Sequence, residues 1–277
     1  MSLLVMVIVI VGVCLLMVAL LLLLRRGPRP VRDLGPFGEL LSSVGALFGV
    51  LLAFVIVLAF QNYDDAQAAA AAEANSVLRL FREAEIVPAP QGPRAAGAAL
   101  CYARAVSHDE WPRLARGQTP RYTGVWTLAL ERAPATFHLR TEPEKIAANE
   151  FTSALADRGQ QRATRTLKAG ETVPTAVLLV LILGAVATLL TTLLFADPAE
   201  RVGIQIVGVS AVTAVLVGAM LLLVAFHNPY GSSAAALEPT AMETGAQIMN
   251  SEVSLARPPI PVPCNSVGRP GPSRLAR

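Results

Sequence analysis

The side chains through which this chain could do chemistry are too scattered to form a recognisable reactive site. Asp64, Asp65 and Glu73 fall on one predicted helix, but no second acidic cluster follows at a spacing that suits a metal ion. The sequence also lacks GxSxG, a phosphate-binding glycine loop, HExxH and CxxC. We therefore expect no enzyme, no metal site and no cofactor. The histidines, which share no motif, are His108, His138 and His227.

The three cysteines are dispersed along the chain. Cys14 lies in an apolar stretch, Cys101 in a polar region and Cys264 in a Pro-rich tail. No two of them have metal-ligand spacing, and an odd, scattered set does not make a disulfide framework. The sequence thus gives no expectation of a disulfide-stabilised fold.

Four long stretches without Asp, Glu, Lys or Arg dominate the sequence. Each has 21 to 25 residues, and about 20 helical residues cross a hydrocarbon core of roughly 30 Å. Only 16% of the residues are charged and 53% are hydrophobic, with a mean hydropathy of +0.52. Because soluble proteins average about 25% charged residues, we predict a multi-pass protein of the plasma membrane. The stretches are Leu3–Leu24, Leu40–Phe60, Thr172–Phe195 and Val202–Phe226.

The predicted spans carry no ionisable residue of the Asp, Glu, His, Lys or Arg type. Pumps and proton-coupled transporters usually keep such residues at membrane depth, because moving protons or ions needs titratable or charged partners. This absence argues against a proton relay. It leaves a passive pore, or a protein without transport activity.

Small residues recur at four-residue spacing in two of the spans. Gly45 and Gly49 form a GxxxG pattern, and a ridge of small residues runs through Ser210, Ala214 and Gly218. Such spacing lets helices approach closely, within one chain or between subunits. One stripe of the second span has two interpretations: it lines a pore, or it packs against the Ser210 ridge. The stripe consists of Ser42, Gly45, Gly49, Leu52 and Ile56.

The spans form two predicted hairpins around a polar insert. The insert carries 14 basic and 13 acidic residues, a balance typical of a water-facing domain. Its patterns are helical, and its Ala-rich start continues the second span out of the membrane. The predicted fold is an all-α membrane protein. Its parts are a transmembrane hairpin (1–60), the helical insert (61–171), a second hairpin (172–226), a short helical tail (227–255) and a disordered tail rich in Pro and Arg (256–277).

Prolines and glycines divide the insert into further predicted helices. The last of them begins with a capping box, because Thr141 and Glu144 have the spacing at which each side chain accepts a hydrogen bond from the other residue's backbone. The predicted helices are Arg94–His108, Tyr122–Arg132 and one from Thr141 towards Leu167, with a further short helix at Ala234–Met249 in the tail.

Arginines favour a topology in which the two hairpin loops are cytoplasmic. Four arginines follow the first span and none precedes it, and such basic flanks tend to stay inside. This topology places the insert and both termini outside the cytoplasm. The total count decides little, because the two hairpin loops hold five basic residues and the insert holds four close to the third span.

Three short patterns flank the spans. The helix that leaves the second span carries Glu73-Ala74-Asn75. The insert contains Tyr102 and then Glu110-Trp111-Pro112, and the last span is followed by Asn228-Pro229-Tyr230-Gly231. In this order and between two hairpins, the patterns resemble the bestrophin-like family of bacterial and plant membrane proteins. The resemblance covers roughly residues 40–245.

The resemblance implies kinship with bestrophins, which are pentameric anion channels with a cytosolic helical domain and a pore lined by the second span. That orientation is opposite to the one that the arginines favour. The acidic calcium clasp of animal bestrophins has no counterpart in this sequence, so calcium gating is not implied.

The shared residues have architectural interpretations. Glu73 and Asn75 are expected to cap or to pair with arginines of the long helix near 158–165. Trp111 would bury a large area beside a Pro-terminated helix. The Pro and Gly after the fourth span favour a sharp exit turn.

Three functional hypotheses follow. The first is a homo-oligomer in the lipid bilayer, a pentamer if it is built like bestrophins, acting as an anion channel. The second is a non-conducting scaffold or accessory subunit of a larger membrane complex. The third is a sensor, which requires a concave pocket within Gln61–Glu171. Nucleic acid is not an expected partner, because the net charge is only +3.

Overall fold

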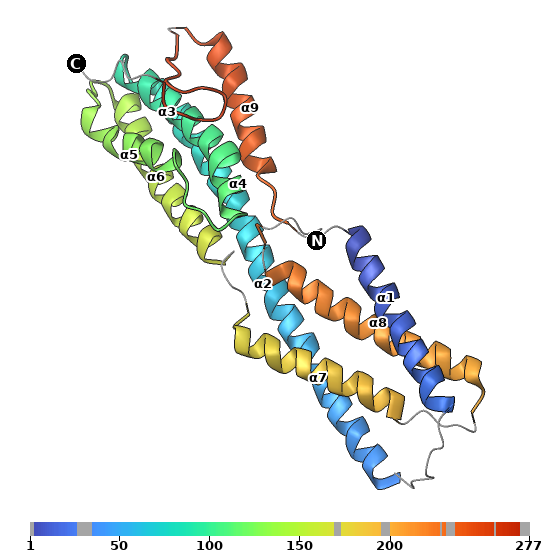
Figure 1. Ribbon diagram of the computed structural model, residues 1–277. Coiled ribbons are helices and arrows are strands. Elements are labelled where there is room, and N and C mark those ends of the chain that lie inside the picture. Colours follow the sequence, from blue (N-terminus) through green and yellow to red (C-terminus); the bar gives the residue numbers. More distant parts are fainter. Residues whose placement is uncertain are drawn as a thin grey trace. The chain divides into compact units, whose positions relative to one another are not determined.

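The fold is all-α, as predicted (Figure 1). The computed structural model describes residues 3–26, 35–168, 173–194, 200–227, 229–230, 236–257 and 259–271, and their side chains except at 26, 35–42 and 227. These residues form helices and no strand, apart from one isolated bridge between Cys264 and Pro270. The elements are α1 (Leu3–Arg26), α2 (Gly35–Ile86), α3 (Gln91–Ala105), the π-helical turn η1 (Val106–Glu110), α4 (Trp111–Leu114), α5 (Thr123–Arg132), the 3₁₀ turn η2 (Pro134–Thr136), α6 (Glu142–Lys168), α7 (Thr175–Leu194), α8 (Val202–His227) and α9 (Thr240–Leu255).

The helices of the insert follow the sequence patterns closely. The second span and the Ala-rich segment after it form the single helix α2. The capping box at the start of α6 is present: the backbone N–H of Thr141 donates to Glu144 Oε2 at 3.1 Å, and the N–H of Glu144 donates to Thr141 Oγ1 at 3.4 Å. The helix predicted at Arg94–His108 starts at Gln91 and passes into η1, where one wider turn changes the direction of the following side chains.

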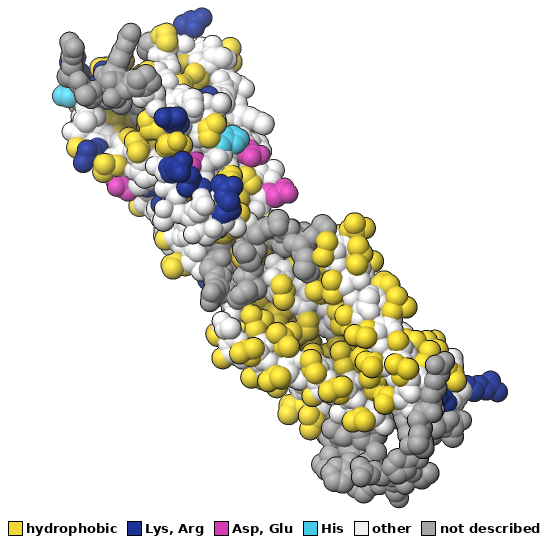
Figure 2. Space-filling model, in the orientation of Figure 1, with side chains coloured by type: hydrophobic (Ala, Val, Ile, Leu, Met, Phe, Trp, Pro, Cys, Tyr) yellow, Lys and Arg dark blue, Asp and Glu magenta, His cyan; other side chains and the backbone are white. Residues whose placement is uncertain are grey.

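The chain divides into two compact units. The membrane unit comprises residues 1–63 and 170–236, and the helical unit comprises residues 64–169 and 237–277. Helix α2 belongs to both. Four helices have the length and composition to cross a membrane: α1, the apolar part of α2, α7 and α8. In Figure 2 hydrophobic side chains cover the visible face of the membrane unit, and Lys, Arg, Asp and Glu side chains gather on the helical unit.

Within the membrane unit, α1 packs along α8 and α8 along α7. Arg25 links the end of α1 to the start of α8. Its Nη1 donates to Gln205 Oε1 at 2.7 Å, and its Nη2 donates to the carbonyl of Glu200 at 2.9 Å. An apolar cluster joins α2 to α7 and α8. It contains Leu52, Ala59, Val173, Leu181, Leu216, Leu223 and Phe226, with Phe48, Val55 and Ile56 against its edge.

The stripe predicted on the second span does not act as one surface. Leu52 is 5% exposed and, with Ile56, packs against α7 and α8. In contrast, a Cβ added to Gly45 or Gly49 would meet nothing within 4 Å. The side chain of Ser42 lies outside the described residues.

The small-residue ridge of α8 lies against α1, which does not support the interpretation that the stripe of the second span packs on this ridge. The thiol of Cys14 lies 3.6 Å from the carbonyl of Ser210, and a Cβ on Gly218 would lie 3.9 Å from Ile10 Cδ1. Helix α2 instead meets other residues of α8, since Leu52 and Ala59 share a cluster with Leu216 and Leu223.

The C-terminal tail differs from the disorder that its composition predicts. Residues 259–271, here called the C-terminal strap, lie on α3 and α5. Cys264 forms a disulfide with Cys101 of α3, 163 residues earlier in the chain. The indole of Trp126 donates to the carbonyl of Gly268 at 2.6 Å. These contacts supply the fixed partners that a Pro-rich segment cannot provide for itself.

We predict that Gly184→Leu destabilises the membrane unit. A Cβ at this position of α7 would overlap the ring of Phe48, and over-packing of this kind costs about 1–3 kcal/mol. The thermal unfolding midpoint in detergent should therefore fall. It is measured from the folded protein that size-exclusion chromatography recovers after heating. Gly208→Leu is the matched control on α8, because a Cβ there meets nothing within 4 Å. Equal midpoints for the two variants would contradict the α2–α7 packing.

Candidate functional site

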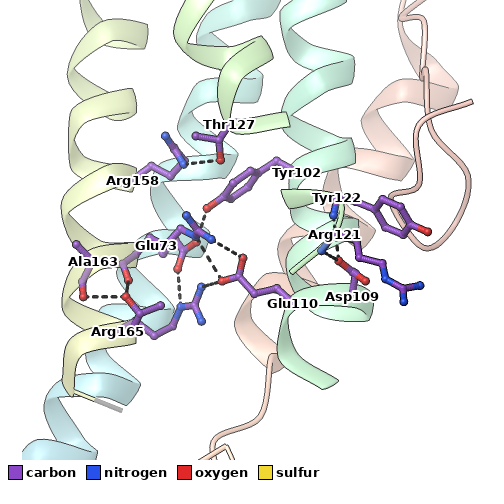
Figure 3. Close-up of polar contacts among 12 residues, drawn as sticks. Glu73, Tyr102, Asp109, Glu110, Arg121, Tyr122, Thr127, Arg158, Ala163 and Arg165 are labelled. Atoms are coloured by element: carbon purple, nitrogen blue, oxygen red, sulfur yellow. Dashed lines mark hydrogen bonds and ion pairs between the residues drawn. The ribbon is translucent and has the colours of Figure 1, made fainter. Parts of the chain in front are cut away.

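A buried network of ion pairs lies at the centre of the helical unit (Figure 3). Arg165 of α6 donates through Nε to Glu73 Oε2 of α2 at 2.7 Å and through Nη2 to Glu110 Oε1 at the end of η1 at 2.6 Å. All three side chains are fully buried. One guanidinium thus binds carboxylates from two different segments.

The network extends from Arg165 in two directions. Arg162, one turn earlier on α6, donates to Glu110 Oε2 at 2.8 Å. The hydroxyl of Tyr102 on α3 donates to Glu73 Oε1 at 2.7 Å. Two arginines and two glutamates balance in charge, and the phenol satisfies a remaining carboxylate oxygen, as a buried polar network requires.

Trp111 closes the network on the side of α4. Its ring centroid lies 4.5 Å from Arg165 Cζ, a cation–π distance. Its indole N–H donates to the carbonyl of Leu237 at 2.8 Å. The same tryptophan therefore contacts the central guanidinium and ties the returning C-terminal segment to the network.

Local sequence explains why these charges can meet. The faces of α2 and α3 towards the core are rich in alanine, which allows close helix approach: Ala95, Ala96, Ala99 and Ala103 are buried. Long Arg and Glu side chains fill the remaining space. The π-helical turn places Glu110 towards α6, a placement typical of π-bulges at specialised sites.

Electrostatics keep the carboxyl group of Glu110 charged. Burial by itself would raise its pKa, but the charges and hydrogen bonds of Arg165 and Arg162 outweigh burial and lower the pKa. Burial, and then the charge of Glu73, raise the pKa of Tyr102 well above its ordinary value, so this phenol remains a hydrogen-bond donor. Burial would lower the pKa of Arg162, whereas its hydrogen bond to Glu110 raises it.

The structure brings together most of the residues that the sequence patterns single out. Glu73 pairs with an arginine of the predicted segment 158–165, and Tyr102, Glu110 and Trp111 join it. Their arrangement suits a structural lock, because each charge is already compensated. Among the described residues, no group of three or more His, Cys, Asp or Glu could hold a metal ion.

Two of the predicted residues lie elsewhere. Asn75 is exposed and lines a cleft of about 420 Å³ between α2 and α9. It does not join the arginines, because two residues along a helix turn the side chain to the opposite face from Glu73. Pro229 lies in a turn after α8, as expected, whereas Gly231 lies outside the described residues.

Sequence reasoning missed two features of the helical unit. Asp109 anchors the segment before α5, because its Oδ1 accepts from Arg113 Nε at 2.8 Å and its Oδ2 from the N–H groups of Arg121 and Tyr122 at 2.6 and 3.1 Å. The disulfide between Cys101 and Cys264 was also missed. A count of scattered cysteines contains no signal for a pair so far apart in the chain.

The fold and the network define a four-span helical membrane protein whose water-facing part is built around a buried charge cluster. The family model of the bestrophin-like domain matches residues 8–234. The chain therefore belongs to the bestrophin-like family, which confirms the resemblance drawn from its sequence patterns. It is a membrane protein of the bestrophin type.

Solved structures support the same fold. A crystal structure described as a membrane protein has a TM-score of 0.67 and 16% identity, covering 87% of this chain and 97% of that chain. Two point mutants of a bacterial bestrophin homolog from Klebsiella pneumoniae have TM-scores of 0.67 and 0.63, each with 16% identity, covering 87% of this chain and 98% and 96% of theirs. At this identity the likeness concerns the fold alone. No curated protein matches the chain.

We predict that the ion-pair network makes stability depend on acidic pH. The pKa of Glu110 is lower in the folded protein than its unfolded value of about 4.3. The unfolded state therefore binds more protons, and the contribution of Glu110 is present above about pH 4.3 and is lost as the pH falls through the folded pKa. The unfolding midpoint of the wild type should therefore drop as the pH falls below about 4.3.

Glu110→Gln is the test variant. It should be less stable at neutral pH by roughly 3–5 kcal/mol, because a buried charge loses its partner, and its midpoint should change less with acid. Glu150→Gln, an exposed residue paired with Arg79, should retain the slope of the wild type. Parallel pH curves for Glu110→Gln and the wild type would contradict this role.

Proposed function

We propose that this bestrophin-like protein forms a homo-oligomeric anion channel with α2 at the subunit contacts and along the conducting axis. The observation that carries the proposal is the open face of α2 within the membrane unit. Gly45 and Gly49 offer a close-approach surface that no atom of the described residues would occupy within 4 Å of an added Cβ. A second subunit is the natural occupant of a GxxxG surface left open in this way.

The apolar side chains on the same helix suit a hydrophobic constriction. Leu52 packs inside the subunit and so cannot line a pore. We therefore assign the constriction to an exposed stripe of α2 whose residues are 4, 3 and 4 positions apart. Such a lining conducts without ionisable groups at membrane depth. The arginines that follow the first span, among them Arg25 and Arg26, favour the entry of anions. The stripe consists of Leu47, Leu51, Phe54 and Leu58. The kinship with bestrophins favours five copies.

The channel is tested by reconstituting the purified protein in planar bilayers. We expect anion currents, and Phe54→Ala should change their conductance, because this ring is 62% exposed on the proposed lining stripe. Leu183→Ala is the matched control. Leu183 is similarly exposed but belongs to α7 and not to the proposed lining, so the variant's currents should equal those of the wild type.

The oligomer is measured on the same preparation by mass photometry and by particle symmetry. Gly49→Leu should reduce the assembly without unfolding the subunit. Silence across voltages and anions, from protein shown to be folded and symmetric, would overturn the channel and favour the scaffold. A monodisperse monomer would overturn both.

We further propose that the helical unit faces the oxidising side of the plasma membrane. Cys101 and Cys264 pair with a Cα–Cα distance of 5.8 Å, and the Cys101 side chain is fully buried. Stable disulfides persist outside the cytoplasm and are rare inside it. Two spans, α7 and α8, separate the two cysteines, so both lie on the same side of the membrane. The arginines after α1 favour the same topology.

Labelling of intact cells tests this orientation. Gln118→Cys in the helical unit and Glu200→Cys between α7 and α8 are each introduced into a Cys14→Ala background, in which the remaining native cysteines are paired. An impermeant maleimide should label position 118 and spare position 200. The reverse pattern would contradict the proposal and favour the orientation of bestrophins.

A further inference from the structure

A cleft on the helical unit combines two arginines with hydroxyl groups. It lies between α5 and α6, has a volume of about 360 Å³ and falls entirely within the insert. The residues that line it are Thr127, Glu131, Arg158, Gly159, Arg162, Ala163 and Thr166. A concave pocket in the insert is the feature that the sensor hypothesis required.

Arg158 lines this cleft with much of its hydrogen-bonding capacity unused. Its side chain is 3% exposed, and its Nε has no partner among the described residues. Its Nη1 reaches Thr127 Oγ1 only at 3.5 Å (Figure 3). Its Nη2 reaches Glu131 Oε1 only at 3.4 Å. The ring of Tyr102 lies 5.0 Å from its Cζ and shields it on one side. A buried guanidinium with one open donor and two long contacts favours an additional acceptor.

The neighbouring side chains extend the same donor surface. Arg162 lies one turn from Arg158 on α6, on the same face of the helix, and its side chain is 30% exposed although it also binds Glu110. Gly159 is exposed and also lines the cleft, and a Cβ there would meet nothing within 4 Å among the described residues. The hydroxyls of Thr127 and Thr166 complete the lining.

Glu131 provides the opposing charge in this lining. Its side chain is 51% exposed, so it can turn into solvent when a stronger anion arrives. Two guanidinium groups with hydroxyls and one displaceable carboxylate are an arrangement that suits a polyatomic oxyanion, because several acceptor oxygens can bind several fixed donors at once.

We propose that this cleft binds a small oxyanion of the phosphate class, which displaces Glu131 from Arg158. The site lies in the helical unit and is independent of conduction along α2, so binding and current are separate measurements. Because Arg162 also holds Glu110, an occupied cleft is coupled through one side chain to the buried network.

Calorimetric titration of the full-length protein with inorganic phosphate, at constant ionic strength set with chloride, tests the site. Saturable binding to the wild type is expected. Gly159→Leu fills the cleft without a change of charge and should weaken binding at least about tenfold. Gly124→Leu is the matched control on α5, where a Cβ also meets nothing within 4 Å, and it should bind like the wild type.

Two charge variants sharpen the test. Glu131→Gln should tighten binding, because the competing carboxylate is removed, and Arg158→Met should abolish it. Competition by glycerol phosphate identifies a free anion as the ligand, and competition by short-chain phosphatidic acid alone identifies a lipid headgroup; either places the phosphate group in the cleft. No saturable heat with phosphate, or equal affinity for Gly159→Leu and Gly124→Leu, would overturn the site.

Discussion

Arg165 carries a full positive charge with no exposure to solvent, and the helical unit is arranged around the need to compensate it. Removing a guanidinium from water costs several kcal/mol unless fixed partners replace its hydration. Here Glu73 comes from α2, Glu110 from η1 and the ring of Trp111 from α4. Because each partner belongs to a different segment, compensating one charge sets the register of all of them. The network therefore fixes the positions of α2, η1, α4 and α6 relative to one another through a single side chain.

The two units depend on different forces, and α2 passes through both. In the membrane unit, contacts are mostly apolar and depend on shape; for example, Gly184 leaves room for the ring of Phe48. Helices in lipid associate through such close packing, because no hydrophobic effect drives them together there. In the helical unit, buried charges and fixed indole hydrogen bonds decide the arrangement. A single helix of this length, Gly35–Ile86, connects the open glycine face in the membrane to Glu73 in the network.

Much of the architecture follows from the sequence because its causes are local. Span length and the absence of charge predict the membrane helices, and the capping box at Thr141 predicts the start of α6. The pairing of Glu73 with an arginine of the 158–165 segment was expected from the pattern that this chain shares with the bestrophin-like family. The partner of Cys101 and the packing partner of the α8 ridge did not follow, because each depends on contacts between segments far apart in the chain. Composition and periodicity do not encode such contacts. Helix periodicity does separate Asn75 from Glu73, and the expectation that both reach the same arginines overlooked it.

The helical unit is discontinuous in sequence, since the second hairpin lies between residues 169 and 237. Its first part is synthesised before α7 and α8, whereas the carbonyl of Leu237, helix α9 and the strap are made only after both spans. Until then Trp111 lacks its acceptor, and the face of α3 around Cys101 stays uncovered. The helical unit is therefore complete only after α7 and α8 have been synthesised. A chain that has not yet completed this step leaves the Cys101 thiol unpaired and the Ala-rich face of α3 without the strap.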